Sequence, residues 1–173
     1  MKKFLLLFIV LLFPAVVCAA TSTSSAQPVQ YDLPYPGMLP NSPLYFLKQT
    51  RDWILDKLIV DPVKKTEFYI LQGDKRLVMG GQLLNSGSGA LGEQTISKGE
   101  KYMNNAVTTL LSFKAQGTAV PAYLIDHMTK SLAKHEEVLN GQVAKMTDAT
   151  VKSGLTGSLD LVHMLQSELL KLQ

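Results

Sequence analysis

The sequence predicts an all-α protein, a small antiparallel helical bundle of about five helices preceded by a proline-rich extended strap. Apolar residues recur at steps of three and four along most of the chain, which is the period of helices that pack by one face. No segment alternates apolar and polar residues as a half-buried strand does. Residues suited to helix starts stand at intervals that leave short connections, which is typical of antiparallel neighbours.

The first twenty residues have the three parts of a secretory signal peptide: two lysines, an apolar run over residues 4–17, and small residues before a polar stretch. We expect residues 1–20 to be removed after Ala19 or Ala20. The mature protein would then be extracytoplasmic, either secreted, periplasmic or held in the cell envelope. The run is shorter than the 18 or more residues expected of a spanning helix.

Two alternatives remain for the leader. In either of them the leader would attach the protein to a membrane, whereas simple cleavage would not. The leader is retained as an anchor, or Cys18 is lipidated, although Val17 is not the small residue usual before such a cysteine. After simple cleavage the chain has no cysteine and no disulfide.

We predict that mass spectrometry of the exported protein will find Ala20 or Thr21 at the N-terminus, because the small residues directly precede this point. A retained Met1, or a lipid on Cys18, would contradict the prediction.

Residues 21–42 form the predicted strap. Four prolines lie between residues 31 and 43, and each fixes φ and favours an extended residue before it. Apolar residues between the prolines favour a strap that lies on the domain: Tyr31, Leu33, Tyr35, Met38 and Leu39. The alternative is a proline-rich recognition segment.

The helical bundle domain is predicted over residues 43–173. Ser42 before Pro43, and Asp61 before Pro62, each predict an N-cap followed by proline at the first helical position. The first helix would run from Pro43 to Leu58 and pack through one apolar stripe, consisting of Leu44, Leu47, Ile54 and Leu58.

The second helix would run over residues 62–84, and its packing face is unusual. Large residues alternate along it with the small residues Thr66, Gly73 and Gly80. A glycine inside a helix costs about 1 kcal/mol relative to alanine, so we expect a neighbouring helix to approach closely here. The alternative is that Gly80 and Gly81 end or kink the helix.

Three further helices are predicted over residues 95–115, 121–146 and from 147 or 148 to the C-terminus. The glycine-rich stretch 85–92 marks the clearest break. It matches the dinucleotide-binding pattern G-x-G-x-x-G, but no strand precedes it, so we interpret it as a flexible loop.

His135 and Gln142 fall on the packing face of the fourth predicted helix. Buried polar residues need partners and fix the register of packed helices, so we interpret the two as a core polar pair. The alternative is that they line a ligand cavity. His127, His135 and His163 do not have the spacing of a metal site in a bundle.

The serine-nucleophile pattern G-x-S-x-G is absent, and the one cysteine of the sequence lies in the leader. We therefore expect no enzyme activity and no cofactor. Removing Lys2 and Lys3 from 17 basic residues leaves 15 against 14 acidic ones, so we expect no binding to nucleic acid.

A partial resemblance covers residues 37–84. The matching positions are GMLPNSPLYFLK over residues 37–48, then Arg51, Asp61-Pro62, Lys64-Lys65, Glu67 and Arg76-Leu77. This region resembles the bacterial domain-of-unknown-function family 5667. The resemblance implies an exported or membrane-tethered bacterial helical module, with no activity or cofactor to carry over. Gly73, Gly80 and Gly81 depart from the family's alanine-rich second helix.

These observations predict a non-catalytic exported helical module that binds an unknown protein or a cell-envelope component. The alternative is a helical receptor for a small apolar ligand in the bundle core, at the level of His135 and Gln142. A receptor would have an internal cavity there. An interaction module would have a filled core and an exposed apolar patch.

Overall fold

The computed structural model describes residues 28–172, so the predicted leader, Cys18 and the first part of the strap lie outside the described residues. The helices are α1 (Tyr45–Leu58), α2 (Pro62–Asn85), α3 (Gly89–Ala115), α4 (Ala122–Lys145) and α5 (Ala149–Leu169), followed by a 3-10 turn at Leu170–Leu172. No strand occurs among residues 28–172. The predicted all-α fold is confirmed.

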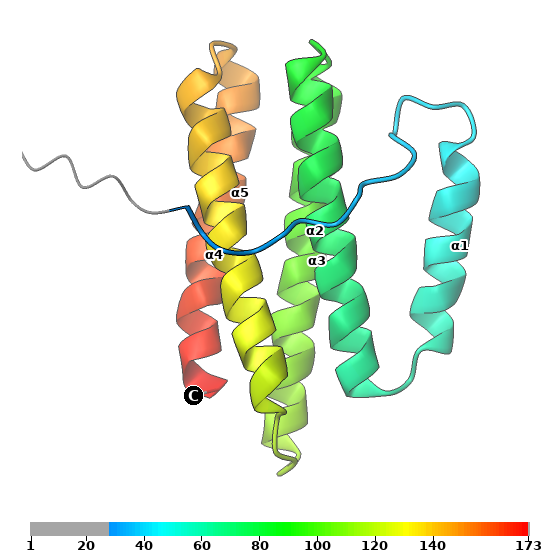
Figure 1. Cartoon of the computed structure of the whole chain (residues 1–173), viewed down its shortest axis with the longest axis vertical. Helices are drawn as coiled ribbons and strands as arrows, with labels where there is room; N and C mark the ends of the chain where they lie inside the picture. The colour runs from blue at the N-terminus through cyan, green and yellow to red at the C-terminus, as the bar shows by residue number, and fades with distance from the viewer. Residues whose placement is uncertain (1–27, 173) are drawn as a thin grey trace, which may run out of the picture.

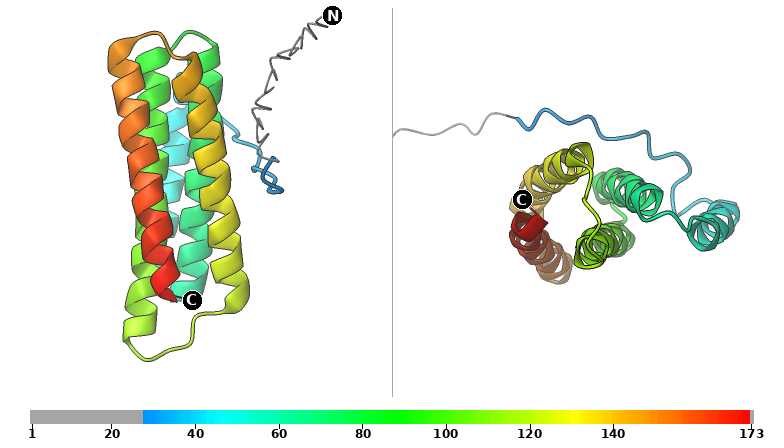
Figure 2. Two further views of the ribbon diagram at one scale, coloured as in Figure 1. Left: turned by 90° about the vertical axis from the view of Figure 1, so that its left-hand side faces the viewer. Right: turned by 90° about the horizontal axis from the view of Figure 1, so that it is seen from below.

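Helices α2 to α5 form an up-and-down bundle, and α1 lies outside it, alongside α2 (Figures 1 and 2). Around the bundle α2 contacts α3 and α4, and α5 contacts the same two helices from the opposite corner. The closest contact in the fold joins α2 and α3, whereas α1 contacts the other helices sparsely. The core is therefore built from four helices, with the fifth added at one edge.

The predicted packing faces of the last three helices are buried. Leu155, Val162 and Leu165 of α5 face inward, as do Met103 of α3 and Leu132 of α4. Burying each such side chain stabilises the fold by about 1.5–3 kcal/mol relative to leaving it in water. The core clusters these residues without a break from one end of the bundle to the other.

Glycines explain the close contact between α2 and α3. A Cβ atom on Gly80 would lie 2.7 Å from the carbonyl oxygen of Gly92, and one on Gly92 would lie 2.9 Å from that of Gly80. Gly73 and Gly99 face each other in the same way, with 3.3 Å and 3.1 Å to the opposite carbonyl oxygen. Thr66, two helical turns before Gly73, is also buried. Helix α2 runs through Gly80 and Gly81 without a break.

The predicted loop over residues 85–92 is wrong in extent. Helix α3 begins at Gly89, and the connection is reduced to residues 86–88, with Gly87 at a φ of +84°. Gly92 lies inside α3 because its missing side chain admits the backbone of α2. Gly92 is therefore a helix-packing residue and not part of a turn.

The two predicted caps differ. Asp61 precedes α2 and accepts a hydrogen bond from the Lys64 amide at 2.8 Å. The prediction for Ser42 is wrong: α1 begins at Tyr45, and Leu44 occupies the cap position without a side-chain hydrogen bond. The reason is a tight turn, in which the Ser42 carbonyl accepts from the Tyr45 amide at 3.1 Å.

We expect Asp61→Ala to lower the free energy of unfolding by about 0.5–2 kcal/mol, because an amide of the first turn loses its partner. Ser42→Ala is the matched control and should leave the denaturant midpoint unchanged. Equal midpoints for both variants, measured by circular dichroism, would refute the assignment of the cap.

The described part of the strap lies across the bundle and passes over α4 and α2 (Figure 1). Its Val29 amide donates to Glu137 on α4 at 2.6 Å, and Lys48 of α1 donates to the Pro36 carbonyl at 2.8 Å. The strap thus connects opposite edges of the molecule, from α4 to α1.

Candidate functional site

A chain of polar side chains crosses the bundle core. His135 of α4 is completely buried, and its Nδ1 lies 2.8 Å from Oε1 of Glu100 on α3. Its Nε2 lies 3.0 Å from Oδ1 of Asp74 on α2, which also accepts from the Ser131 hydroxyl at 2.6 Å. Glu100, Asp74 and Ser131 are all buried, so three helices meet at one polar level.

The partners of His135 determine its charge. Both ring nitrogens face carboxylate oxygens, and only an imidazolium has a donor for each. Burial acts to lower the pKa of His135, but the attraction of Glu100 and the hydrogen bonds to Asp74 and Glu100 raise it to about 9. The ring is therefore a cation between two buried acids at neutral pH.

The chain extends to the strap. The Tyr31 hydroxyl donates to Oδ2 of Asp74 at 2.5 Å and lies 3.0 Å from Nε2 of His127, which is half-buried on α4. Burial and the neighbouring Asp74 carboxylate raise the pKa of the Tyr31 phenol. Tyr31 thus covers the outer end of the polar chain and ties the strap to the bundle.

The members of this polar chain are engaged with one another. Ser131 donates to Asp74 and has no contact with a free base, while both nitrogens of His135 are occupied by acids. No group of three or more histidine, cysteine or acidic side chains in residues 28–172 is arranged to hold a metal ion. The chain joins α2, α3 and α4 at one register.

The predicted pair of His135 and Gln142 is not brought together. Gln142 is half-buried near Gly81, two turns farther along α4, and takes no part in the hydrogen bonds of His135. Sequence reasoning missed Asp74 and Glu100. Their signal was available, because each lies three residues before a large core residue, Leu77 and Met103.

We expect the stabilisation that His135 provides to be lost as the pH rises to about 9, and the difference in stability between the parent and a variant without this histidine isolates it. The folded-state pKa of His135 lies above the ordinary value of 6.5, so its stabilisation is complete below about pH 6.5 and is lost through pH 9. The total loss is about 3 kcal/mol. Lys48, whose pKa is lowered by burial to about 8, acts in the opposite direction.

Urea unfolding at several pH values measures how the free energy of unfolding changes with pH. His135→Gln, which retains Lys48, should show no such loss between pH 7 and pH 10. Parallel curves for the parent and this variant would show that His135 is uncharged in the folded protein.

A second feature lies on α1, whose apolar side faces outward. The sequence-based prediction that Leu44, Leu47, Ile54 and Leu58 pack into the bundle is wrong, because all four are exposed. Of the fourteen exposed large apolar residues among residues 28–172, eight lie between Leu44 and Val60, and they are 38% to 91% exposed. We call this set the α1 outer face: Leu44, Phe46, Leu47, Trp53, Ile54, Leu55, Leu58 and Val60.

Polar contacts explain the orientation of α1. Asp52 is buried, 2.7 Å from the Arg51 guanidinium and 3.8 Å from that of Arg76 on α2. Asp56 pairs with Lys65 at 3.1 Å. Both acids of α1 thus point toward α2, and its two exposed charges, Arg51 and Lys57, are positive.

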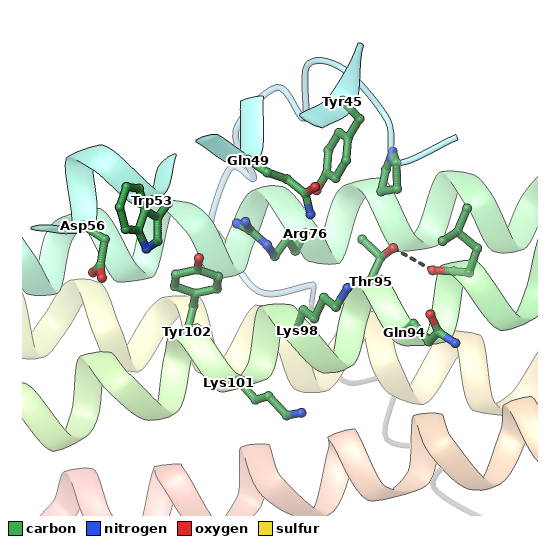
Figure 3. A pocket seen from close by; sticks show the side chains of 12 residues that line it. Tyr45, Gln49, Trp53, Asp56, Arg76, Gln94, Thr95, Lys98, Lys101 and Tyr102 are labelled. Carbon is green, nitrogen blue, oxygen red and sulfur yellow. Dashed lines mark hydrogen bonds between the residues drawn. The ribbon is translucent and has the colours of Figure 1, made fainter. Parts of the chain in front are cut away.

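A pocket of about 320 Å³ opens beside α1, between this helix, α2 and α3 (Figure 3). Tyr45 and Trp53 of α1 form its upper wall, and Tyr102 of α3 forms the lower wall. The Arg76 guanidinium lies between them, 4.3 Å from the centre of the Tyr102 ring. The pocket does not include His135 or Gln142.

No known protein family, curated protein or solved structure matches the chain. The resemblance over residues 37–84 accordingly stays an expectation. None of the helices within residues 28–172 has the length and apolar character needed to cross a membrane.

Proposed function

We propose that this protein is a non-catalytic exported module that attaches to an anionic membrane surface of the cell envelope through the α1 outer face. The observation that carries the proposal is the orientation of α1. Its large apolar side chains and Lys57 are exposed to solvent, while both acids face inward and Arg51 pairs with the buried Asp52 at the edge of the face. Apolar residues accompanied by Lys and Arg are typical of helices that lie in a membrane interface.

The kinds of side chain favour this partner. Trp53 and Phe46 lie beside the leucine stripe, and such amphipathic and aromatic side chains are favoured at the boundary between headgroups and acyl chains. Lys75 on α2 lies next to Arg51 in the groove on one side of α1, and Lys98 on α3 lies on the other. Cations thus accompany the apolar ridge on both flanks.

A second copy of this chain fits the face less well. Arg51 lies near the middle of α1, so an antiparallel two-fold pair of α1 helices would place two Arg51 side chains together. Like charges in contact oppose such a pair. An anionic surface, by contrast, attracts Arg51 and Lys57 at once.

Co-sedimentation with vesicles tests the proposal. The exported protein, with its N-terminus determined by mass spectrometry, is mixed with phosphatidylglycerol vesicles or phosphatidylcholine vesicles. We expect binding to the anionic vesicles that weakens as the salt concentration rises. Leu58→Glu should weaken it by about tenfold or more, because an apolar contact of about 1.5–3 kcal/mol is lost and a repelled charge is added.

Leu170→Glu is the matched control. Leu170 is 65% exposed at the end of α5, against 69% for Leu58, and both variants make the same chemical change. We expect it to bind as the parent does. Equal weakening by the two variants would contradict the role of α1, and a parent that binds neither kind of vesicle would leave an acidic protein surface as the occupant.

A further inference from the structure

The pocket beside α1 is lined by more cationic than anionic side chains. Lys98, Lys101 and Arg76 line it together with one acid, Asp56. Asp56 is already paired with Lys65, and Asp52 lies beside Arg76. Neither Lys98 nor Lys101 forms an ion pair within residues 28–172. The pocket therefore has positive charge that no carboxylate of the described chain neutralises.

The side chains are arranged around one space. In Figure 3 Arg76 and Lys98 lie between α1 above and α3 below, and Gln49 reaches down toward Arg76. The Arg76 side chain is almost fully buried and held by Gln72, whose side-chain oxygen accepts from it at 2.5 Å. Arg76 is thus fixed, whereas Lys98 is exposed and free to approach a ligand.

We infer that this pocket binds the phosphate headgroup of an anionic phospholipid, with Lys98 as the main contact and Arg76 as a fixed source of positive charge. The inference rests on the proposed function, since the pocket opens beside the α1 outer face. Guanidinium and ammonium groups are the usual protein partners of phosphate oxygens. Gln49 and Gln94 supply amide donors for a headgroup hydroxyl.

The walls of the pocket favour a lipid over a free anion. Trp53 and Tyr45 offer aromatic surface next to the cations, which suits the glycerol and the first carbons of a lipid. Trp53 belongs both to this wall and to the α1 outer face. A headgroup in the pocket would therefore leave its acyl chains beside the apolar ridge.

Titration of the exported protein with monomeric dihexanoyl-phosphatidylglycerol tests the inference. Trp53 is the one tryptophan of the sequence, so its fluorescence reports directly on this wall. We expect a saturable change in emission with the anionic lipid. Inorganic phosphate and dihexanoyl-phosphatidylcholine should bind more weakly by a factor of about ten or more. Equal binding of inorganic phosphate, or of the zwitterionic lipid, would overturn the assignment to an anionic lipid.

Three charge-matched variants locate the site. Lys98→Gln should weaken binding of the soluble lipid by about tenfold, because a charge-assisted hydrogen bond is lost. Lys145→Gln on α4 and Lys152→Gln on α5 remove the same charge outside the pocket, and both should retain the affinity of the parent. Equal affinity of all four proteins, or equal losses in all three variants, would show that no specific pocket contact exists.

The two proposals fail separately. The soluble lipid requires no membrane, and Leu58, on which the vesicle experiment depends, does not line the pocket. If Leu58→Glu abolishes vesicle binding while Lys98→Gln changes nothing, the headgroup site is refuted and attachment through α1 stands. If the parent does not bind vesicles, attachment through α1 is refuted. The titration with soluble lipid then decides by itself whether the pocket binds a headgroup.

Discussion

Replacing His135 with leucine should lower the free energy of unfolding by about 3–5 kcal/mol. The volume of the side chain is roughly kept, but the carboxylates of Asp74 and Glu100 lose the cation between them. Both acids are buried, and Oε2 of Glu100 already has no hydrogen-bond partner in the described structure. Removing one member of a buried ion network costs more than the network contributes, because a charge is left uncompensated.

His163→Leu is the control for the chemistry of the substitution. His163 lies on α5 with about half of its side chain exposed, 3.4 Å from Glu136 at the surface. This change should alter the free energy of unfolding by no more than about 0.5 kcal/mol. Urea denaturation measures both variants, and similar midpoints would refute a charged His135 network.

Gly80→Ala should destabilise the protein by about 1–3 kcal/mol, although alanine is the better helix former. A Cβ atom at this position meets the Ile96 side chain and lies 2.7 Å from the Gly92 carbonyl oxygen. A side chain can move to another rotamer, but the backbone of α3 cannot yield without separating two helices. Gly73→Leu should destabilise for the same reason, since Met103 and Gly99 fill the space opposite.

Gly141→Ala should change the stability of the protein in the opposite direction. Gly141 is exposed on α4, and nothing lies within 4 Å of a Cβ atom built there. Helix propensity alone then acts, so this variant should be more stable than the parent by about 1 kcal/mol. A Gly80→Ala variant that also gains stability would show that α2 and α3 are not in close contact.

The sequence predicted the helices well because periodicity and capping are local properties. Pro62 begins α2 as expected, and Asp148, one of the two predicted starts of the last helix, accepts from the Val151 amide at 2.9 Å. The start of α3 was misplaced because glycine is ambiguous. Gly89 and Gly92 are breakers in a local reading, whereas contact with α2 makes Gly92 a packing residue.

The candidate sites were less predictable because they depend on contacts between distant segments. The polar level around His135 joins residues 35 and 61 positions away, and no local pattern links Glu100 or Asp74 to that histidine. The apolar stripe of α1 was recognised, but its direction was not. An amphipathic helix normally packs by its apolar side, and here the ion pairs of Asp52 and Asp56 turn that side outward.

Contact between α1 and the membrane can be followed through Trp53. Because this is the one tryptophan in the sequence, its emission reports on α1 even if another segment of the chain also binds lipid. With phosphatidylglycerol vesicles containing lipids brominated near the glycerol backbone, we predict a shift of the emission to shorter wavelength and strong quenching. Sedimentation of the protein with the vesicles while Trp53 emission stays unchanged would show that α1 does not contact the membrane.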